Sequence, residues 1–363
     1  MKKVGIITFY KKNYGAFLQA YALQKVIKDL GHMPEAMNYN FSAHSVISDL
    51  TRNPLYFVKK TIFDFVSRKK IAEKVQLFRI SIRKHLNETS TEYKSKKSLK
   101  SCAENYDVYL TGSDQVWNPM IFPDNLCVRL LNFASQDKII ASYAASISAK
   151  TITERDITKI REGLARFDYI SVREESTKKI IGTIPGKEIH VHVDPCLLLK
   201  PEQWADIAEE PEVKNYLLVY KLMSQPGMND FIKRIADENN LKVISIGKLN
   251  GYNGEYIHIP FTSPEKFLGY FQCASYIVTN SFHGVVFSII NKKRATFFLP
   301  AASYDRALNL IQKTGTDALL EQRYLSDDEI ERAYKDVDSI LDKERTDSIR
   351  YLSKVLNAKH KGL

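Results

Sequence analysis

Short apolar runs alternate with amphipathic segments along almost the whole chain. The apolar runs are rich in Val, Ile and Tyr, which is typical of buried parallel strands, and the segments between them repeat with a helical period. Strands are predicted at 4–10, 106–110, 139–144, 169–172, 189–193, 216–220, 241–246, 276–278 and 295–299. Helices are predicted at 17–30, 154–167, 228–239, 264–273, 282–290 and 327–356, with two more from Thr177 and from Arg306. This regular alternation predicts α/β domains with parallel sheets.

The alternation of predicted strands and helices pauses after Asp194 and Pro195 and then begins again in the second half of the chain. A chain of 363 residues is too long for one typical core and suits two domains. We place the domains at 1–200 and 201–363, and the last helix could return to pack on the first domain. The predicted fold is two doubly wound, Rossmann-like α/β domains that face each other across a cleft.

The formal net charge of +11 favours an anionic partner. A membrane surface or an anionic substrate suits it better than nucleic acid, because no helix-turn-helix or RNA-binding signature is present. The segment 42–100 concentrates the basic residues, with apolar side chains such as Phe57 and Val66 among them at helical spacing. Such a segment can lie on an anionic membrane, which predicts peripheral membrane association. An ordinary solvated helical face is the alternative.

The start of the chain is predicted to be a strand and not a signal peptide. The apolar run from Val4 to Tyr10 is short, is broken by Gly5 and leads into Lys11 without a cleavage site. No apolar run approaches the roughly 18–20 residues of a membrane span. The four cysteines form no CxxC pair, which predicts reduced, buried thiols in a cytoplasmic protein.

A strand, a polar turn and an apolar helix follow one another at 276–290. Thr279, Asn280 and Ser281 can accept hydrogen bonds from the free N–H groups at a helix start. His283 then lies at a helix N-terminus just past the end of a strand, where open α/β sheets bind ligands and where a phosphate or carboxylate is favoured. A histidine there can exchange a proton near neutral pH. The alternative for a lone histidine in an apolar run is a core residue.

Two loops of the first half also follow strands and carry polar side chains. The first contains Asn13, Tyr14 and Gly15, and the second contains Asp114, Gln115, Trp117 and Asn118. Planar polar groups beside an aromatic ring can position sugar hydroxyls. Ordinary turn chemistry is the alternative for both loops.

Arg173 ends the strand at 169–172, and its guanidinium is a natural partner for a carboxylate or phosphate. A structural ion pair with Glu174 or Glu175 is the alternative. His190 and His192 lie on one face of another strand, a spacing that could bind a metal. No third ligand lies at a suggestive spacing, so no metal site is predicted.

Several segments, read in order, resemble motifs of the polysaccharide pyruvyl transferase family. They are NYGAFLQAYALQ near the start, GSDQVWNP at 112–119, SVREES at 171–176, DPCLLL at 194–199, and TNSFHGVVFSI at 279–289 followed by Arg306. The resemblance covers nearly the whole chain. It implies the two-domain architecture called GT-B, with the site in the cleft between the domains.

The resemblance also implies an activity in polysaccharide biosynthesis, of the kind that builds exopolysaccharide, capsule and cell envelope. Pyruvate would pass from phosphoenolpyruvate to two hydroxyls of a sugar and form a cyclic ketal. The acceptor would be a polysaccharide precursor, often lipid-linked at the inner membrane face. No metal and no cofactor besides the donor is expected.

Individual residues match the family motifs. His283 is expected to protonate the methylene carbon of the donor, or to shuttle the proton of a sugar hydroxyl. Arg173 is the first choice for binding phosphoenolpyruvate, with the start of the helix at 282–290 stabilising the departing anion. The helix-start residues assigned to the donor are Ser281, Phe282 and Gly284. The residues assigned to the acceptor are Asn13, Tyr14, Gly15, Asp114, Gln115, Trp117 and Asn118.

One position departs from the family pattern. Many members have an arginine two residues before the motif histidine, where this chain has Ser281. A serine can hydrogen-bond a phosphate but brings no charge. Either Lys221, Lys248 or Arg306 supplies the charge, or donor use differs.

Two rival functions remain open at this point. One is a glycosyltransferase of the same architecture that uses a nucleotide sugar. The other is a non-catalytic polyanion-binding protein, which would explain the charge of +11 directly. The placement of Arg173, Asp114 and His283 at strand ends, instead of a basic stripe, argues against the second.

Overall fold

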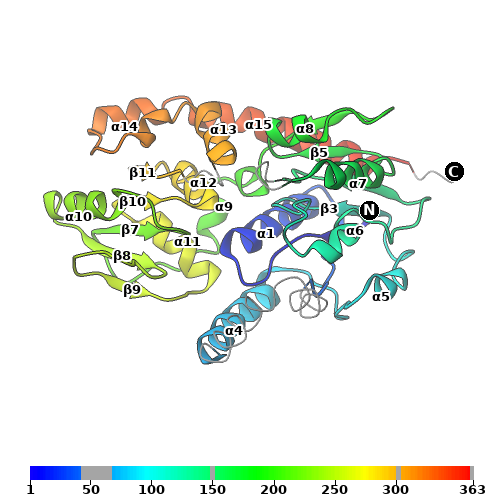
Figure 1. Ribbon diagram of the computed structural model, residues 1–363, viewed down its shortest axis with the longest axis horizontal. Helices are drawn as coiled ribbons and strands as arrows, with labels where there is room; N and C mark the ends of the chain where they lie inside the picture. The colour runs from blue at the N-terminus through cyan, green and yellow to red at the C-terminus, as the bar shows by residue number, and fades with distance from the viewer. Residues whose placement is uncertain (42–67, 148–151, 300–303, 360–363) are drawn as a thin grey trace. The chain divides into compact units, whose positions relative to one another are not determined.

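The computed structural model describes residues 1–41, 68–147, 152–299 and 304–359 (Figure 1). The chain divides into two compact units. Unit 1 comprises Met1–Leu198 together with Thr346–Leu363, and unit 2 comprises Leu199–Arg345. Of the predicted basic segment 42–100, residues 42–67, among them Phe57 and Val66, lie outside the described residues.

Unit 1 is built on a parallel sheet with the strand order β2-β1-β3-β4. These strands are β1 (Lys3–Ile7), β2 (Met33–Ala36), β3 (Val108–Thr111) and β4 (Ile139–Ser142). A parallel pair, β5 (Ile170–Val172) and β6 (Ile189–Val191), follows. Single bridges from Ala141 to Tyr169 and from Ala145 to Val172 connect this pair to the strand β4. The carboxyl ends of the strands therefore meet along one edge.

The helices of unit 1 lie between these strands. They are α1 (Tyr14–Asp29), α4 (Arg68–His85), α5 (Lys96–Lys100), α6 (Leu126–Arg129), α7 (Glu154–Leu164) and α8 (Glu175–Ile181). The helices predicted at 17–30, 154–167 and from Thr177 are present as α1, α7 and α8. The helix α1 begins after Asn13, whose Oδ1 accepts a hydrogen bond from the backbone N of Ala16 at 3.0 Å. This cap satisfies one of the free N–H groups at the helix start and fixes the loop that follows β1.

Unit 2 holds a second parallel sheet with the strand order β11-β10-β7-β8-β9. In Figure 1 these strands lie one below another in that order. They are β7 (Tyr216–Tyr220), β8 (Lys242–Ile246), β9 (Ile257–Ile259), β10 (Tyr276–Thr279) and β11 (Ala295–Phe297). The first strand in sequence lies at the centre and the order reverses there, as in a Rossmann-like fold.

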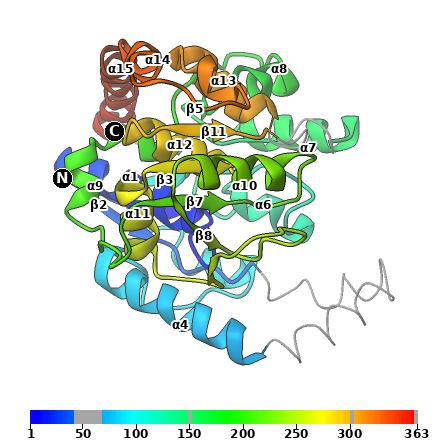
Figure 2. The ribbon, with the colours of Figure 1, turned by 90° about the vertical axis from the view of Figure 1, so that its left-hand side faces the viewer.

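Both faces of this second sheet are covered. Alternate residues of β7 point to opposite faces, and all five residues from Tyr216 to Tyr220 are buried. Leu217 and Val219 pack with α10 (Met228–Glu238), which lies in front of β7 and β8 in Figure 2. The ring of Tyr220 contacts Phe267 at a centroid distance of 5.0 Å. The remaining helices are α9 (Pro201–Ala205), α11 (Pro264–Cys273), α12 (Phe282–Ile290), α13 (Tyr304–Thr314) and α14 (Asp327–Tyr334).

The last predicted helix differs from the prediction, because two helices replace the single helix at 327–356. The helix α14 ends at Tyr334, and α15 (Val337–Asn357) begins three residues later. Tyr334 Oη donates a hydrogen bond to the carbonyl of Lys293 at 2.7 Å, which holds the end of α14 against the chain that enters β11. None of the helices in the described residues is both long enough and apolar enough to cross a membrane.

Candidate functional site

The predicted turn around His283 is present in unit 2. The strand β10 ends at Thr279 and the helix α12 begins at Phe282. Ser281 is the N-cap residue, and its hydroxyl accepts a hydrogen bond from the backbone N of Gly284 at 3.5 Å. His283 lies in the first turn of the helix and is buried. The turn therefore places an imidazole beside the positive end of a helix, which favours an anion.

Gly284 is required in this turn because the helix begins so close to its own strand. A Cβ atom at this position would lie 2.1 Å from the hydroxyl oxygen of Thr279. That hydroxyl donates a hydrogen bond to the carbonyl of Tyr220 at 2.6 Å, so it has little freedom to move. The glycine of the TNSFHG motif thus allows a strand and a helix to meet at van der Waals distance.

Asn280 connects the His283 turn to the loop that follows β7. Its Oδ1 accepts a hydrogen bond from the backbone N of Leu222 at 2.7 Å, and its Nδ2 donates to the carbonyl of Met223 at 2.6 Å. From the sequence, Asn280 is predicted only as a turn residue. In the structure, both ends of its amide hold a neighbouring loop, which therefore cannot move independently of the turn.

The three cations assigned to the donor lie on separate elements of unit 2. Lys221 follows β7 and donates a hydrogen bond from Nζ to Asn229 Oδ1 at 3.2 Å, and burial lowers the pKa of Lys221. Lys248 is exposed just beyond the end of β8, and Arg306 is half-buried in α13. Lys221 and Lys248 thus extend from the carboxyl ends of two adjacent strands.

In unit 1, a buried network of charges joins three of the motifs. Arg173 donates from Nε to Glu174 Oε1 at 2.5 Å and from Nη1 to Asp194 Oδ2 at 2.9 Å. Ser113 Oγ donates to the same oxygen of Asp194 at 3.1 Å. The residues come from SVREES, DPCLLL and GSDQVWNP. The network therefore fixes the carboxyl ends of β3, β5 and β6 to one another.

The alternative of an ion pair between Arg173 and Glu174 is present in the structure. Burial opposes the charge of Arg173, but the carboxylates of Glu174 and Asp194 outweigh burial and raise its pKa. Donor binding by Arg173 stays a prediction. The two carboxylates fix the position of the guanidinium, so any ligand meets it in one orientation.

A buried arginine that the sequence analysis missed organises the GSDQVWNP loop. Arg129 donates from Nη1 to the carbonyls of Val116 at 2.7 Å and Asn118 at 3.0 Å, and from Nη2 to the carbonyl of Phe122 at 2.9 Å. Burial lowers the pKa of Arg129 to about 9, so the guanidinium remains charged at neutral pH. A signal was present, because a lone arginine in an otherwise apolar segment, Leu126 to Leu131, needs several acceptors.

Three of the residues assigned to the acceptor are more buried than a direct contact requires. Trp117 has no exposed surface, and its indole donates a hydrogen bond to the carbonyl of Arg129 at 3.3 Å. Tyr14 packs on Phe78 at a centroid distance of 5.4 Å, and Gly15 is buried in the first turn of α1. In this conformation these residues support the loops, and the ring of Trp117 offers no face to a sugar.

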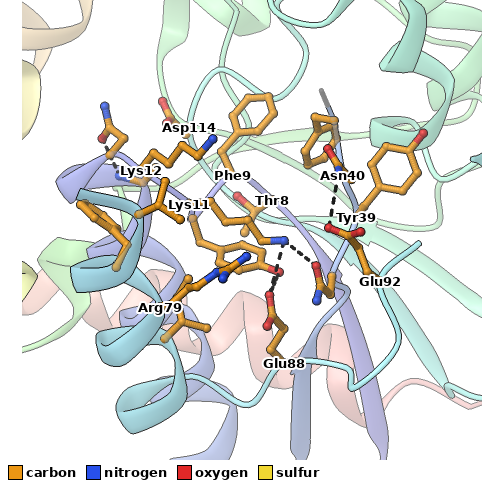
Figure 3. A pocket seen from close by; sticks show the side chains of 18 of the residues that line it. Thr8, Phe9, Lys11, Lys12, Tyr39, Asn40, Arg79, Glu88, Glu92 and Asp114 are labelled. Carbon is orange, nitrogen blue, oxygen red and sulfur yellow. Dashed lines mark hydrogen bonds and ion pairs between the residues drawn. The ribbon is translucent and has the colours of Figure 1, made fainter. Parts of the chain in front are cut away.

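Three of the other acceptor residues remain nearer the surface, whereas Asn118 is buried. Asn13 is exposed, Asp114 and Gln115 are half-buried, and Asn118 donates from Nδ2 to Gln115 Oε1 at 2.7 Å. Of this group, Asn13 and Asp114 line a pocket of about 570 Å³ in unit 1 (Figure 3). The pocket lies where the chain leaves β1, β2 and β3, and one wall is provided by α4.

The backbone of this pocket is unusual. Lys12, Asp114 and Phe122 line it, and all three have positive φ angles of 64°, 73° and 49°. A phenylalanine or a lysine in this region is strained, and such strain is concentrated at functional sites. The contacts of Arg129 with this loop hold the Phe122 conformation in place.

The floor of the pocket contains a polar network. Tyr10 Oη donates a hydrogen bond to Glu88 Oε1 at 2.5 Å, and Lys11 Nζ lies 3.6 Å from the same oxygen. Lys11 also donates to Asn38 Oδ1. Figure 3 shows the amine of Lys11 turned toward Glu88. Burial lowers the pKa of Lys11.

His190 and His192 contact an aromatic ring of the last helix. Their ring centroids lie 5.4 Å and 4.5 Å from that of Tyr351. The Nδ1 atom of His192 lies 2.8 Å from Ser171 Oγ, and Tyr351 Oη donates to the carbonyl of Ser142 at 2.9 Å. The two histidines therefore belong to the contact between residues 346–357 and the sheet of unit 1.

Comparison with solved structures shows the fold class. UDP-GlcNAc 2-epimerase from Neisseria meningitidis, bound to UDP-GlcNAc, is similar with a TM-score of 0.54 and 9% identity, over 98% of this chain and 99% of that chain. UDP-GlcNAc 2-epimerase from Methanocaldococcus jannaschii is similar with a TM-score of 0.53 and 12% identity, over 98% and 99%. The prediction of two Rossmann-like α/β units, as in GT-B proteins, is confirmed.

A search of the curated proteins finds no match. The family model described as polysaccharide pyruvyl transferase matches residues 13–300. This range includes the strand-end residues described above, the first of which is Asn13 and the last Gly284. The predicted family is therefore confirmed, and the chain belongs to the polysaccharide pyruvyl transferase family.

Proposed function

We propose that the protein transfers pyruvate from phosphoenolpyruvate to two hydroxyls of a sugar in a polysaccharide precursor. The products are a cyclic pyruvate ketal and phosphate. The observation that carries the proposal is the His283 turn in a chain of this family, because it combines a proton-transfer group with the anion-favouring start of α12.

In the proposed reaction, the π electrons of the C2–C3 double bond of phosphoenolpyruvate take a proton at C3, which becomes a methyl group. The cation that develops at C2 is attacked by the first sugar hydroxyl, which releases its proton and balances the proton added to C3. Phosphate then leaves C2, and the second hydroxyl attacks the same carbon and releases its proton, which is balanced by the proton that the departing phosphate takes up. His283 exchanges the proton with C3 or with the attacking hydroxyl.

The donor carries a phosphate and a carboxylate, so its site needs several N–H groups or cations. The hydroxyl of Ser281 and the backbone N–H groups from Phe282 onward suit the phosphate. Lys221 and Lys248 are proposed to supply charge in place of the arginine that many family members carry at position 281. Arg173 is proposed as the further donor ligand of unit 1, and Arg306 as an alternative cation.

A glycosyltransferase that uses a nucleotide sugar is the second candidate. The two structures named above share the fold with this chain, and one is bound to UDP-GlcNAc. This likeness supports the fold alone, so ligand binding must decide between the candidates.

The test is thermal unfolding of the wild type with phosphoenolpyruvate or with UDP. A ligand at 100 times its dissociation constant stabilises the folded state by about 2.7 kcal/mol, which is a readable shift. We expect a shift with phosphoenolpyruvate that Arg173→Ala and Ser281→Ala reduce. A shift with UDP and none with phosphoenolpyruvate would favour the glycosyltransferase.

Turnover is measured by phosphate release in the presence of a sugar acceptor. His283→Ala is expected to lower kcat by about 10²–10⁴, the range of a single general acid or base. The variant His283→Gln, which keeps a hydrogen-bonding side chain but no titrating group, should be equally slow. Wild-type turnover in either variant would remove His283 from the mechanism.

A further inference from the structure

The carboxylates in the pocket of unit 1 are mostly neutralised already. Glu88, Glu92 and Asp114 line it. Glu88 Oε1 lies 3.6 Å from Lys11 Nζ, and Glu92 Oε2 lies 3.5 Å from Lys94 Nζ. The positive charge of the lysine offsets the negative charge of its partner carboxylate, so such a pair adds little net charge to the cavity. The third carboxylate of the lining is Asp114, whose Oδ1 accepts a hydrogen bond from the backbone N of Gln115 at 2.8 Å.

Three further cations line the same pocket. Lys12, Arg79 and Arg83 are exposed, and within the described residues no carboxylate lies at ion-pair distance from any of them. Arg79 and Arg83 are four residues apart on α4 and so project from one face of the helix. Figure 3 shows Arg79 reaching from α4 toward Lys11 and Glu88. The pocket thus has a surplus of positive charge, with two guanidinium groups on one wall.

Another part of the lining is aromatic and accessible. Phe9, Phe41 and Phe122 are half-buried, with ring centroids 5.0 Å, 5.9 Å and 5.7 Å apart. A cluster of accessible rings suits the apolar C–H face of a sugar ring, and polar groups at the edge suit its hydroxyls. The amide side chains of Asn38 and Asn40 and the carboxylate of Glu88 provide those polar groups.

We propose that this pocket binds the sugar acceptor, and that Arg79 and Arg83 select an acceptor that carries an anionic group. The anionic group is a phosphate or a carboxylate attached to the sugar. The inference rests on the proposed pyruvyl transfer in one respect, which is that the bound sugar is the acceptor of that reaction. The binding of a negatively charged sugar follows from the aromatic cluster, the polar floor and the unneutralised arginines.

The proposal gives the basic residues of α4 a role other than the predicted contact with a membrane. Val75, Phe78 and Ile82 line the pocket together with the two arginines, so one continuous face of the helix, from 75 to 83, turns toward the cavity. An arginine fork binds phosphate and carboxylate through two parallel hydrogen bonds. A specific ligand contact therefore suits these side chains better than a diffuse surface charge.

The test is isothermal titration of the purified protein with four probes: glucose, glucose 1-phosphate, glucuronate and inorganic phosphate. We expect the two charged sugars to bind at least tenfold more tightly than glucose and more tightly than phosphate. Arg79→Ala and Arg83→Ala should each weaken the charged sugars about tenfold and leave glucose unchanged. Lys84→Ala is the control, because Lys84 lies on the same helix, is exposed and is not part of the pocket lining.

Several outcomes would overturn the proposal. Equal affinity for charged and neutral sugars removes the selection, and so does an absence of binding by the charged sugars. Tight binding of inorganic phosphate alone would indicate an anion site without a sugar. Lower binding of Arg79→Ala and Arg83→Ala to anionic vesicles, with unchanged titrations, would place the two arginines on a lipid surface.

The inference and the proposed function can fail separately. The titrations are repeated on His283→Ala with phosphoenolpyruvate present, so that an acceptor that binds only after the donor is detected without turnover. Charged sugars that bind through Arg79 while phosphoenolpyruvate has no effect would support the pocket and contradict pyruvyl transfer. If Arg79→Ala leaves the response to phosphoenolpyruvate intact and no sugar is selected, the result would support pyruvyl transfer and contradict the proposed pocket.

Discussion

Nη1 of Arg173 and Oδ2 of Asp194 lie 2.9 Å apart in the interior of unit 1. The two residues belong to different motifs of the family, and Ser113 of a third motif donates to the same carboxylate oxygen at 3.1 Å. The pair therefore holds three strand ends together, in addition to any contact that Arg173 makes with a ligand. A buried ion pair of this kind leaves an uncompensated charge when either partner is removed.

Asp194→Asn is expected to lower the free energy of unfolding by about 3 kcal/mol, because Arg173 then loses one of its two buried carboxylates. Urea denaturation measures the loss. The control is Asp347→Asn, which removes an exposed partner of Arg350 and should cost at most about 1 kcal/mol. Similar small losses in both variants would show that the buried pair is not important for stability.

Arg129→Met should destabilise the loop from Ser113 to Phe122. Four backbone carbonyls, those of Val116, Asn118, Phe122 and Asn125, would lose the guanidinium donor. A hydrogen bond from a charged group contributes about 1.5–3 kcal/mol. Relaxation of the loop recovers part of this cost. We therefore expect the free energy of unfolding, measured by urea denaturation, to fall by at least about 3 kcal/mol. Arg129→Lys keeps the charge but cannot reach all four carbonyls, and it should lose nearly as much. A lysine variant as stable as the wild type would show that charge alone, without the fork geometry, is sufficient.

Gly284→Ala should disrupt the His283 turn, because the added Cβ would meet the hydroxyl of Thr279 at 2.1 Å. The expected loss is about 1–3 kcal/mol, typical of an overpacked site. Thr279→Ala also destabilises, since it removes a hydrogen bond to Tyr220. If the clash is the cause, the double variant loses less than the sum of the two single losses. Additive losses would contradict this explanation.

Asn280→Asp tests whether the amide positions the loop after β7. The variant keeps the acceptor for Leu222 N but replaces the donor to Met223 O with a negative oxygen. We expect faster hydrogen exchange at 221–227 and a weaker response to phosphoenolpyruvate, with little change in global stability. Asn280→Ala removes both hydrogen bonds, so it should show faster hydrogen exchange and a weaker response to phosphoenolpyruvate than Asn280→Asp. Unchanged exchange in both variants would show that the loop is held by other contacts.

Tyr39 predicts a pH dependence of stability at alkaline pH. Burial raises the pKa of Tyr39 to about 12 from the ordinary value of 10.0, with a smaller contribution from Cys127. The folded state therefore keeps the phenol proton longer than the unfolded state. Its contribution to stability is complete below pH 10 and is lost as pH rises toward 12.

The measurement is urea denaturation of wild type and Tyr39→Phe at several values of pH across this window. The phenylalanine variant cannot make the hydrogen bond to Asn125 and should be less stable at neutral pH. Its stability should then fall less steeply with pH, so that the two curves converge. Other buried tyrosines are present in both proteins and cancel in the difference. Parallel curves would contradict the assignment to Tyr39.

The order of strands and helices could be predicted from the sequence because each central strand carries a short apolar run. The two strands that the prediction missed lie at sheet edges. The strand β2 (Met33–Ala36) contains Pro34, which an edge strand tolerates, and β9 (Ile257–Ile259) is short and mostly exposed. Neither carries the apolar run by which a buried strand is recognised.

The candidate site could be predicted only as a set of loops at strand ends. Family motifs indicated Asn13, Asp114 and Trp117, but the direction of each side chain depends on packing that spacing does not encode. Trp117 turns into the core, while Asp114 reaches the pocket. The contribution of Arg79 could not be predicted, because it depends on where α4 lies against three strand ends that are distant in sequence.

The division of the chain has a consequence for the order in which the protein is made. Unit 1 contains the residues that precede unit 2 in the chain and also Thr346–Leu363, among them Tyr351, which reaches the carbonyl of Ser142. Every residue of unit 2 has been synthesised when the chain reaches Arg345. The later-encoded unit is therefore complete first, and the earlier one must wait, with its histidine-bearing strand β6 uncovered, until Tyr351 and its neighbours have been synthesised.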